Sequence, residues 1–104
     1  MIKREKRRYL KLKIECNQPQ DEKAVMDAIH ASVKRLFGEY GANKANIRLI
    51  KGLPEKERLV IRCSHLMLQQ VRAAVASTVE INGTETAIHV LAVSGTLKAL
   101  SKKV

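Results

Sequence analysis

The side chains of this chain that are best suited to chemistry are the lysines and arginines gathered at its two ends. Residues 1–13 carry seven basic residues and one acidic residue, and residues 94–104 carry three lysines and no acid. The stretch between them, 14–93, carries ten basic and nine acidic residues, so nearly all of the net charge of +10 lies at the ends. Because each phosphate that a basic side chain neutralises releases condensed counterions, this pattern predicts a polyanionic partner. A basic surface that only keeps the protein in solution is the alternative.

The cysteines and histidines form no catalytic or metal-binding pattern. Cys16 and Cys63 make no CxxC pair and fall at apolar positions of expected strands, which predicts buried, inert thiols and suits a reducing compartment. His30, His65 and His89 fall on different elements, without a cysteine or aspartate at metal-site spacing. The sequence also lacks a glycine-rich phosphate loop and a carboxylate pair for acid–base catalysis. We therefore expect no catalytic residue, no metal ion and no cofactor bound by this chain.

The hydrophobic pattern predicts one α+β domain with the element order β-α-β-β-α-β. Residues 8–16 alternate between apolar and polar side chains, as in a half-buried strand, and Asp21 can cap the helix that follows. The Asn82-Gly83 pair is a strong hairpin signal. The expected elements are strands at 8–16, 45–51, 58–64 and 85–93, helices at 22–40 and about 66–78, a stub at 79–81, and a short last helix after Thr96. Within the single domain 1–104 we expect a basic segment at 1–8, a globular core at 8–94 and a basic helix or tail at 95–104.

With right-handed crossovers this order gives a ferredoxin-like sandwich, the fold class of the RNA recognition motif. Its antiparallel four-stranded sheet should have the order 4-1-3-2, with both long helices on one face. The first and fourth strands are then antiparallel neighbours, so the two basic ends of the chain should converge. The face away from the helices should present Tyr9, Lys11, Lys13, Arg48, Arg58, Arg62 and His89. The third strand lacks the aromatic residues with which an RNA recognition motif stacks bases, so contacts with phosphates and RNA shape fit better than base reading.

Three stretches of the sequence together resemble one known family. They are Arg4-Glu5-Lys6-Arg7-Arg8-Tyr9 at the first strand, Arg62-Cys63-Ser64-His65 before the second helix, and Val93-Ser94-Gly95-Thr96-Leu97 after the fourth strand. In this order and spacing, over about residues 4–100, the chain resembles archaeal ribonuclease P protein component 2. That family includes the eukaryotic processing-of-precursor subunit, which ribonuclease P shares with its mitochondrial-RNA-processing relative.

The resemblance implies a non-catalytic protein subunit of an endoribonuclease that removes the 5′ leader of precursor tRNA. Catalysis would reside in the RNA subunit, which requires magnesium. The chain would pair with component 3, as a heterodimer or as a heterotetramer of two such pairs. It would support the catalytic domain of ribonuclease P RNA and act on precursor tRNA only indirectly.

The expected RNA contacts are basic side chains that approach phosphates more often than bases. They are Lys3, Arg4, Lys6, Arg7, Arg8, Lys11, Lys13, Arg62, His65, Lys98, Lys102 and Lys103. For Arg62 and His65, RNA contact and a structural role are both open, and residues 93–97 are expected to order the last helix or to contact protein. No apolar run reaches the length of a membrane span and the chain opens with charged residues, so we expect a cytoplasmic protein.

Two other functions stay open at this point. The chain could be a protein-interaction module of another ribonucleoprotein, with its basic ends against an acidic partner. It could also be a small enzyme like acylphosphatase, which shares the fold class. Such an enzyme needs an arginine in a phosphate-cradling loop after the first strand, and residues 17–21 hold neither arginine nor glycine. The enzyme is therefore disfavoured.

Overall fold

The computed structural model describes residues 6–18, 20–53 and 57–101. Its elements follow the chain in the order β1 (Arg7–Cys16), α1 (Glu22–Ala45), β2 (Arg48–Leu53), β3 (Arg58–Ser64), η2 (His65–Met67), α2 (Leu68–Ser77), β4 (Glu80–Ile81), β5 (Thr84–Ser94) and α3 (Leu97–Ser101). The order β-α-β-β-α-β is therefore confirmed, with the stub at 79–81 appearing as the two-residue strand β4 and a 3₁₀ turn, η2, opening the second helix.

Among the described residues the sheet has five strands in the order β2-β3-β1-β5-β4, and neighbouring strands pair antiparallel. Without β4 this is the predicted order 4-1-3-2. The fifth strand follows from the Asn82-Gly83 turn, in which both residues have positive φ angles of 52° and 78°. A two-residue turn of this kind matches the twist of an antiparallel pair, so it joins β4 directly to β5.

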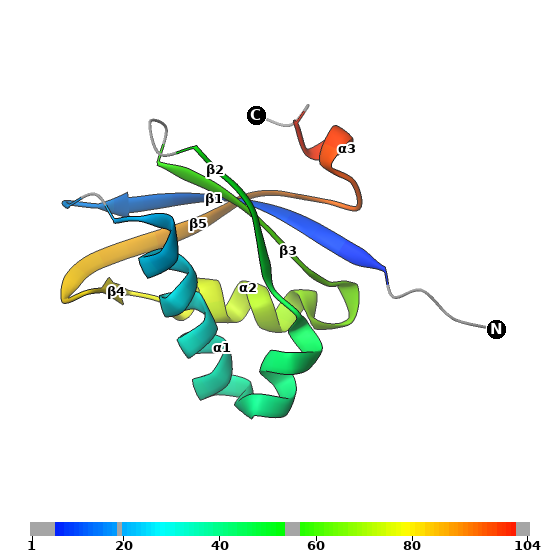
Figure 1. Ribbon diagram of the computed structural model, residues 1–104, viewed down its shortest axis with the longest axis horizontal. Helices are drawn as coiled ribbons and strands as arrows, with labels where there is room; N and C mark the ends of the chain where they lie inside the picture. Colours follow the sequence, from blue (N-terminus) through cyan, green and yellow to red (C-terminus); the bar gives the residue numbers. More distant parts are fainter. Residues whose placement is uncertain (1–5, 19, 54–56, 102–104) are drawn as a thin grey trace.

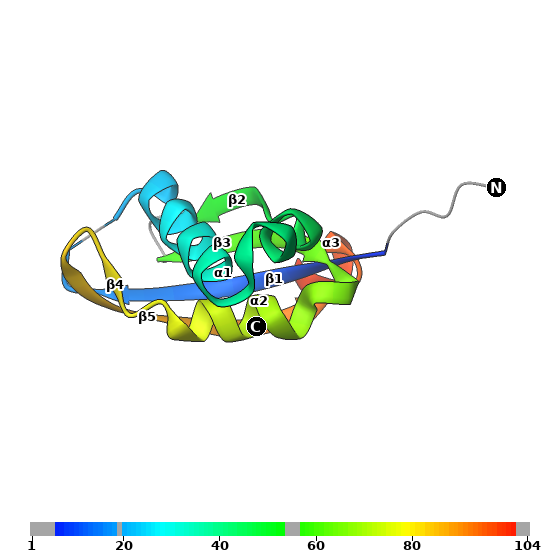
Figure 2. The same cartoon turned by 90° about the horizontal axis from the view of Figure 1, so that it is seen from below.

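The sheet carries helices on both faces, but unequally. α1 and α2 lie on one face and α3 lies on the other, which we call the open face (Figures 1 and 2). The main core lies between the sheet and the two long helices, and its centre includes Leu10, Leu12 and Ile61 from the strands and Ile29 and Val71 from the helices, all fully buried. The alternation of β1 that predicted this arrangement is thus confirmed.

Two further apolar side chains are buried outside the main core. Among the described residues, Val60 and Leu100 are buried but do not belong to the main core. Val60 lies opposite Lys11 in the β1–β3 register, and Leu100 lies on α3, which packs against β1 and β5. The short last helix therefore does not extend into solvent: it covers part of the sheet face that the sequence pattern left uncovered.

Helix α1 begins as predicted and ends later than predicted. The Asp21 carboxylate accepts a hydrogen bond from the Ala24 backbone N–H at 2.7 Å, so the expected cap is confirmed. The helix was expected at 22–40. At Gly38 the backbone instead takes φ 74° and ψ 178°, a conformation that only glycine adopts without strain, and the helix kinks there and resumes. It ends at Ala45, where left-handed Asn46 donates its N–H to the Ala42 carbonyl.

Candidate nucleic-acid interface

The start of β1 lies beside the end of β5, as the topology predicted. Tyr9 is the register partner of Ser94, and a Cβ atom placed on Gly95 would lie 3.7 Å from Nη1 of Arg8. The basic start of β1 and the turn into α3 are therefore neighbours. Four of the predicted RNA contacts, Lys3, Arg4, Lys102 and Lys103, lie outside the described residues.

His65 holds the segment that leads into β1. The Lys6 carbonyl accepts the backbone N–H of His65 at 3.0 Å, and Nδ1 of the His65 ring lies 3.0 Å from the same oxygen. Because a carbonyl can only accept, the ring must donate from Nδ1. The contact is structural, because it ties Lys6, and with it exposed Arg7, to the start of η2, while RNA contact by His65 stays a prediction.

The Ser-Gly-Thr sequence orders the last helix. The Thr96 hydroxyl accepts the Ala99 backbone N–H at 3.1 Å and so caps α3, and the Ser94 hydroxyl lies 3.4 Å from the Thr96 backbone nitrogen. α3 carries exposed Lys98 on the same side of the sheet as the open face. Of the two roles expected for residues 93–97, these contacts support the ordering of the helix.

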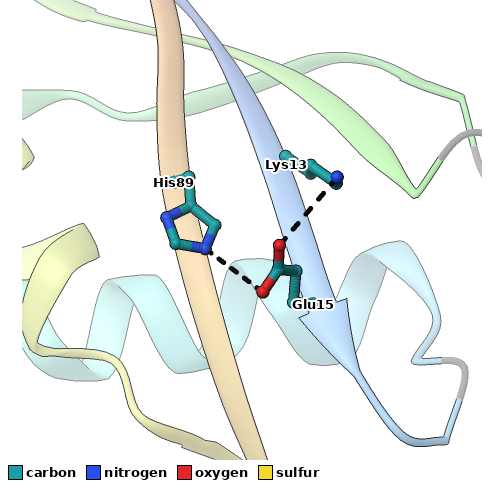
Figure 3. A network of polar contacts seen from close by, with 3 residues as sticks. All are labelled: Lys13, Glu15 and His89. Atoms are coloured by element: carbon teal, nitrogen blue, oxygen red, sulfur yellow. Dashed lines mark ion pairs between the residues drawn. The ribbon is translucent and has the colours of Figure 1, made fainter.

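Three further predicted contacts, Lys11, Lys13 and Arg62, lie on the open face. Arg62 is the register partner of Tyr9, and Lys13 is the register partner of His89. Lys13 is partly neutralised, because its Nζ lies 3.9 Å from a Glu15 carboxylate oxygen whose other oxygen lies 3.4 Å from Nε2 of His89 (Figure 3). All three side chains are about half exposed, so these are weak surface pairs.

The two thiols differ, which the sequence did not predict. Cys63 is buried as expected, and burial raises the pKa of its thiol to about 11 against the opposing effect of nearby Arg8. Cys16 is only half-buried, so the expectation of a second buried thiol is wrong: it sits at the last position of β1, where the core ends. The Thr86 hydroxyl, which hydrogen-bonds Sγ at 3.4 Å, lowers the pKa of the Cys16 thiol.

A hollow of about 520 Å³ lies at the other end of β1 from the basic segment. Its lining includes Cys16, Gln20, Asp21, Glu22 and Arg58. The described part of the loop after β1 thus brings the Asp21 carboxylate, and no arginine, to this hollow. Among the described residues, no three histidine, cysteine, aspartate or glutamate side chains are grouped as metal ligands.

Sequence reasoning left three cations out of the predicted site: Arg48, Lys51 and Arg58. Strict alternation from buried Ile47 would turn Lys51 towards the helices. The β2–β3 register shifts between Leu49 and Lys51, so Lys51 pairs with Val60 on the open face. A β-bulge of this kind carries no reliable signal in a single sequence, apart from the nearby Gly52.

Comparison with known proteins gives a consistent result. The model of the Rpp14/Pop5 family matches residues 8–104. Ribonuclease P protein component 2 of Methanosarcina mazei is 33% identical over 100 residues, covering 96% of this chain and 84% of that protein. The protein of the same name from Pyrococcus furiosus is also 33% identical, with 96% and 83% covered.

A solved structure supports the fold. A chain in the cryo-EM structure of yeast ribonuclease MRP has a TM-score of 0.73 at 15% identity, over 93% of this chain and 79% of that one. Among the described residues, no helix has the length and apolar character needed to cross a membrane.

With the family model matching nearly the whole sequence and relatives matching at about one-third identity, the chain belongs to the Rpp14/Pop5 family.

Proposed function

We propose that this chain is an RNA-binding protein subunit of ribonuclease P, the ribonucleoprotein that removes the 5′ leader of precursor tRNA. The observation that carries the proposal is the match to the Rpp14/Pop5 family over residues 8–104. The relatives of similar sequence that bear the name ribonuclease P protein component 2 support it. The location is the cytoplasm, which two free cysteines suit.

The subunit itself does not catalyse the reaction in this proposal. The RNA subunit holds the active site and requires magnesium, while the protein supplies positive charge near crowded phosphates. The geometry supports this role, because Lys6 and Arg7 are exposed and His65 holds the Lys6 carbonyl, and because Lys98 on α3 is exposed as well. Fixed cations lower the repulsion between RNA segments and therefore lower the magnesium concentration at which the RNA folds and reacts.

The exposed apolar side chains on the helix side of the sheet suit a protein partner, which we assign to component 3. The end of α1 and the adjoining η2 expose large apolar side chains, with Tyr40 79% and Leu66 57% exposed. Leu36 and Phe37 are also exposed there, and α1 packs against η2. Exposed aromatic and aliphatic side chains gathered at one site are typical of protein interfaces. A heterotetramer would be two such pairs.

The test is cleavage of precursor tRNA by ribonuclease P RNA at limiting magnesium, with and without this chain and component 3. We expect stimulation that requires this chain. A variant with Lys6, Arg7 and Arg8 replaced by glutamine should fold normally and need more magnesium for the same rate. If component 3 is folded and bound and the wild-type chain changes nothing, the proposed function is wrong.

A further inference from the structure

The half of the open face formed by β2 and β3 collects cations from separate parts of the sequence. We call Arg48, Lys51, Arg58 and Arg62 the β2–β3 cation cluster. The register places all four on the open face: Arg62 pairs with Tyr9, Arg58 pairs with Lys13, and Arg48 and Lys51 pair with residues of β3 that face the same way. Adjacent strands are about 4.8 Å apart. The four charged positions therefore occupy one continuous patch.

The β-bulge in β2 contributes to this patch. It shifts the β2–β3 register between Leu49 and Lys51, and Lys51 comes to lie on the same face as Arg48, three residues earlier, instead of on the opposite one. Bulges of this kind redirect side chains at functional surfaces. Both side chains are exposed. The bulge thus adds a cation to the open face at a position where an ordinary strand would turn it towards the core.

The cluster also contains an arrangement that lowers stability in the free protein. Arg48 lies directly opposite Arg62, and Arg58 lies directly opposite Lys13. Like charges in direct cross-strand positions destabilise a sheet. Across the described part of the chain, no carboxylate lies within ion-pair distance of the four cluster residues, whereas neighbouring Lys13 has Glu15 within that distance. An anion bound over the cluster would relieve this repulsion.

The surroundings of the cluster favour phosphates over bases. α3 packs against the neighbouring strands β1 and β5. Val60, which lies between Arg58 and Arg62 on β3, is itself buried, so the cations surround an apolar position. Nε of Arg58 is buried and has no hydrogen-bond partner among the described atoms, and a guanidinium offers further donors in a planar fork that fits phosphate oxygens. Tyr9 is the one aromatic side chain that the described registers place on this face. Base stacking would need more.

We propose that the β2–β3 cation cluster is a second RNA-binding surface, separate from the basic start of β1, which holds the phosphate backbone of an RNA segment lying across β2 and β3. The identity of the RNA as ribonuclease P RNA rests on the proposed function. Two separate contacts would fix the orientation of the subunit on its RNA, because one contact alone leaves rotation about it free.

The test compares two variants of the full chain that lose the same charge. The cluster variant is Arg48→Gln, Lys51→Gln, Arg58→Gln, and the control is Lys23→Gln, Lys44→Gln, Arg72→Gln, whose residues are exposed on α1 and α2. The dissociation constant for a ribonuclease P RNA transcript is measured at several salt concentrations. We expect the cluster variant to bind roughly tenfold or more weakly, with a slope of log K against log salt about 2–3 units shallower, since each phosphate contact contributes about 0.7–0.9. The control should change affinity by less than about threefold.

Several outcomes decide the matter. Equal losses of RNA affinity in both variants would show an effect of net charge and overturn the proposal. An unchanged RNA affinity in the cluster variant would also overturn it, even if that variant no longer bound component 3.

The thermal midpoint of the cluster variant should equal or exceed that of the wild type, because like-charge pairs are removed. A lower midpoint contradicts the argument from repulsion. If the triple variant does not fold, Arg48→Gln alone, at an exposed position, is compared with Lys44→Gln. The cleavage assay tests the proposed function separately, because the two variants can differ in RNA affinity even if the wild-type chain stimulates no cleavage.

Discussion

Removing the His65 ring tests how the basic start of β1 is held. Two hydrogen bonds reach the Lys6 carbonyl, one from the His65 backbone and one from Nδ1 of its ring, each 3.0 Å long. His65→Ala removes the second and keeps the first. His65→Asn is the matched control, because the asparagine amide nitrogen can occupy the place of Nδ1 and donate to the same oxygen.

The size of the effect follows from the exposure of the contact. A hydrogen bond contributes a net 0.5–1.5 kcal/mol in general. This contact is exposed, so a value near the lower end, about 0.5–1 kcal/mol, applies. The opening equilibrium of the segment around Lys6 should therefore shift roughly two- to fivefold in His65→Ala.

The assay is amide hydrogen exchange at residue 65, whose N–H donates to the Lys6 carbonyl in all three proteins. Exchange should be roughly two- to fivefold faster in His65→Ala and close to the wild-type rate in His65→Asn. RNA affinity should fall by no more than the same factor, since the charges remain and only their ordering is lost. Equal acceleration in both variants, or none in His65→Ala, would refute the positioning role.

Two further predictions concern buried groups. The Thr78 hydroxyl donates to the Ala74 carbonyl at 2.9 Å, so the Ser32 hydroxyl, 2.8 Å away, donates to the Thr78 oxygen. Thr78→Val leaves the buried Ser32 hydroxyl without this acceptor and should lower the free energy of unfolding, measured by urea denaturation, by about 1–3 kcal/mol. Adding Ser32→Ala removes the unpaired hydroxyl and should recover part of the lost stability. The thiols should react unequally with iodoacetamide at neutral pH: Cys16 is alkylated in the folded protein, and Cys63, with a pKa of about 11, reacts only on unfolding. A double variant less stable than Thr78→Val, or equal alkylation rates, would contradict these assignments.

Local patterns predicted most of the fold because each carries its own physical cause. The alternation of β1 identified Leu10 and Leu12 as core residues, and both are fully buried. The sequence also predicted the Asp21 cap and the Asn82-Gly83 turn, since each depends on residues only one to three positions apart.

Features that depend on contacts distant in sequence were not readable. The extension of α1 past Gly38 requires the packing of its last turn, where a Cβ on Gly41 would lie 3.8 Å from Cε of Met67. The position of α3 on the open face depends on partners in β1 and β5, and its five residues give no amphipathic pattern that could predict it. Turning Lys51 onto the open face requires a register shift against β3.

The charge distribution shows why the candidate site was only half predicted. Basic runs at the ends are visible because their charges are consecutive, whereas residues 14–93 carry nearly balanced charges and indicate no binding surface. The fold brings four of these cations, Arg48, Lys51, Arg58 and Arg62, together on the open face. On α1, by contrast, basic residues such as Lys23 and Lys44 alternate with acidic ones such as Glu22 and Asp27, so the charges there stay mixed. A segment that is almost neutral in composition thus gathers a group of cations on one face, which its charge count does not reveal.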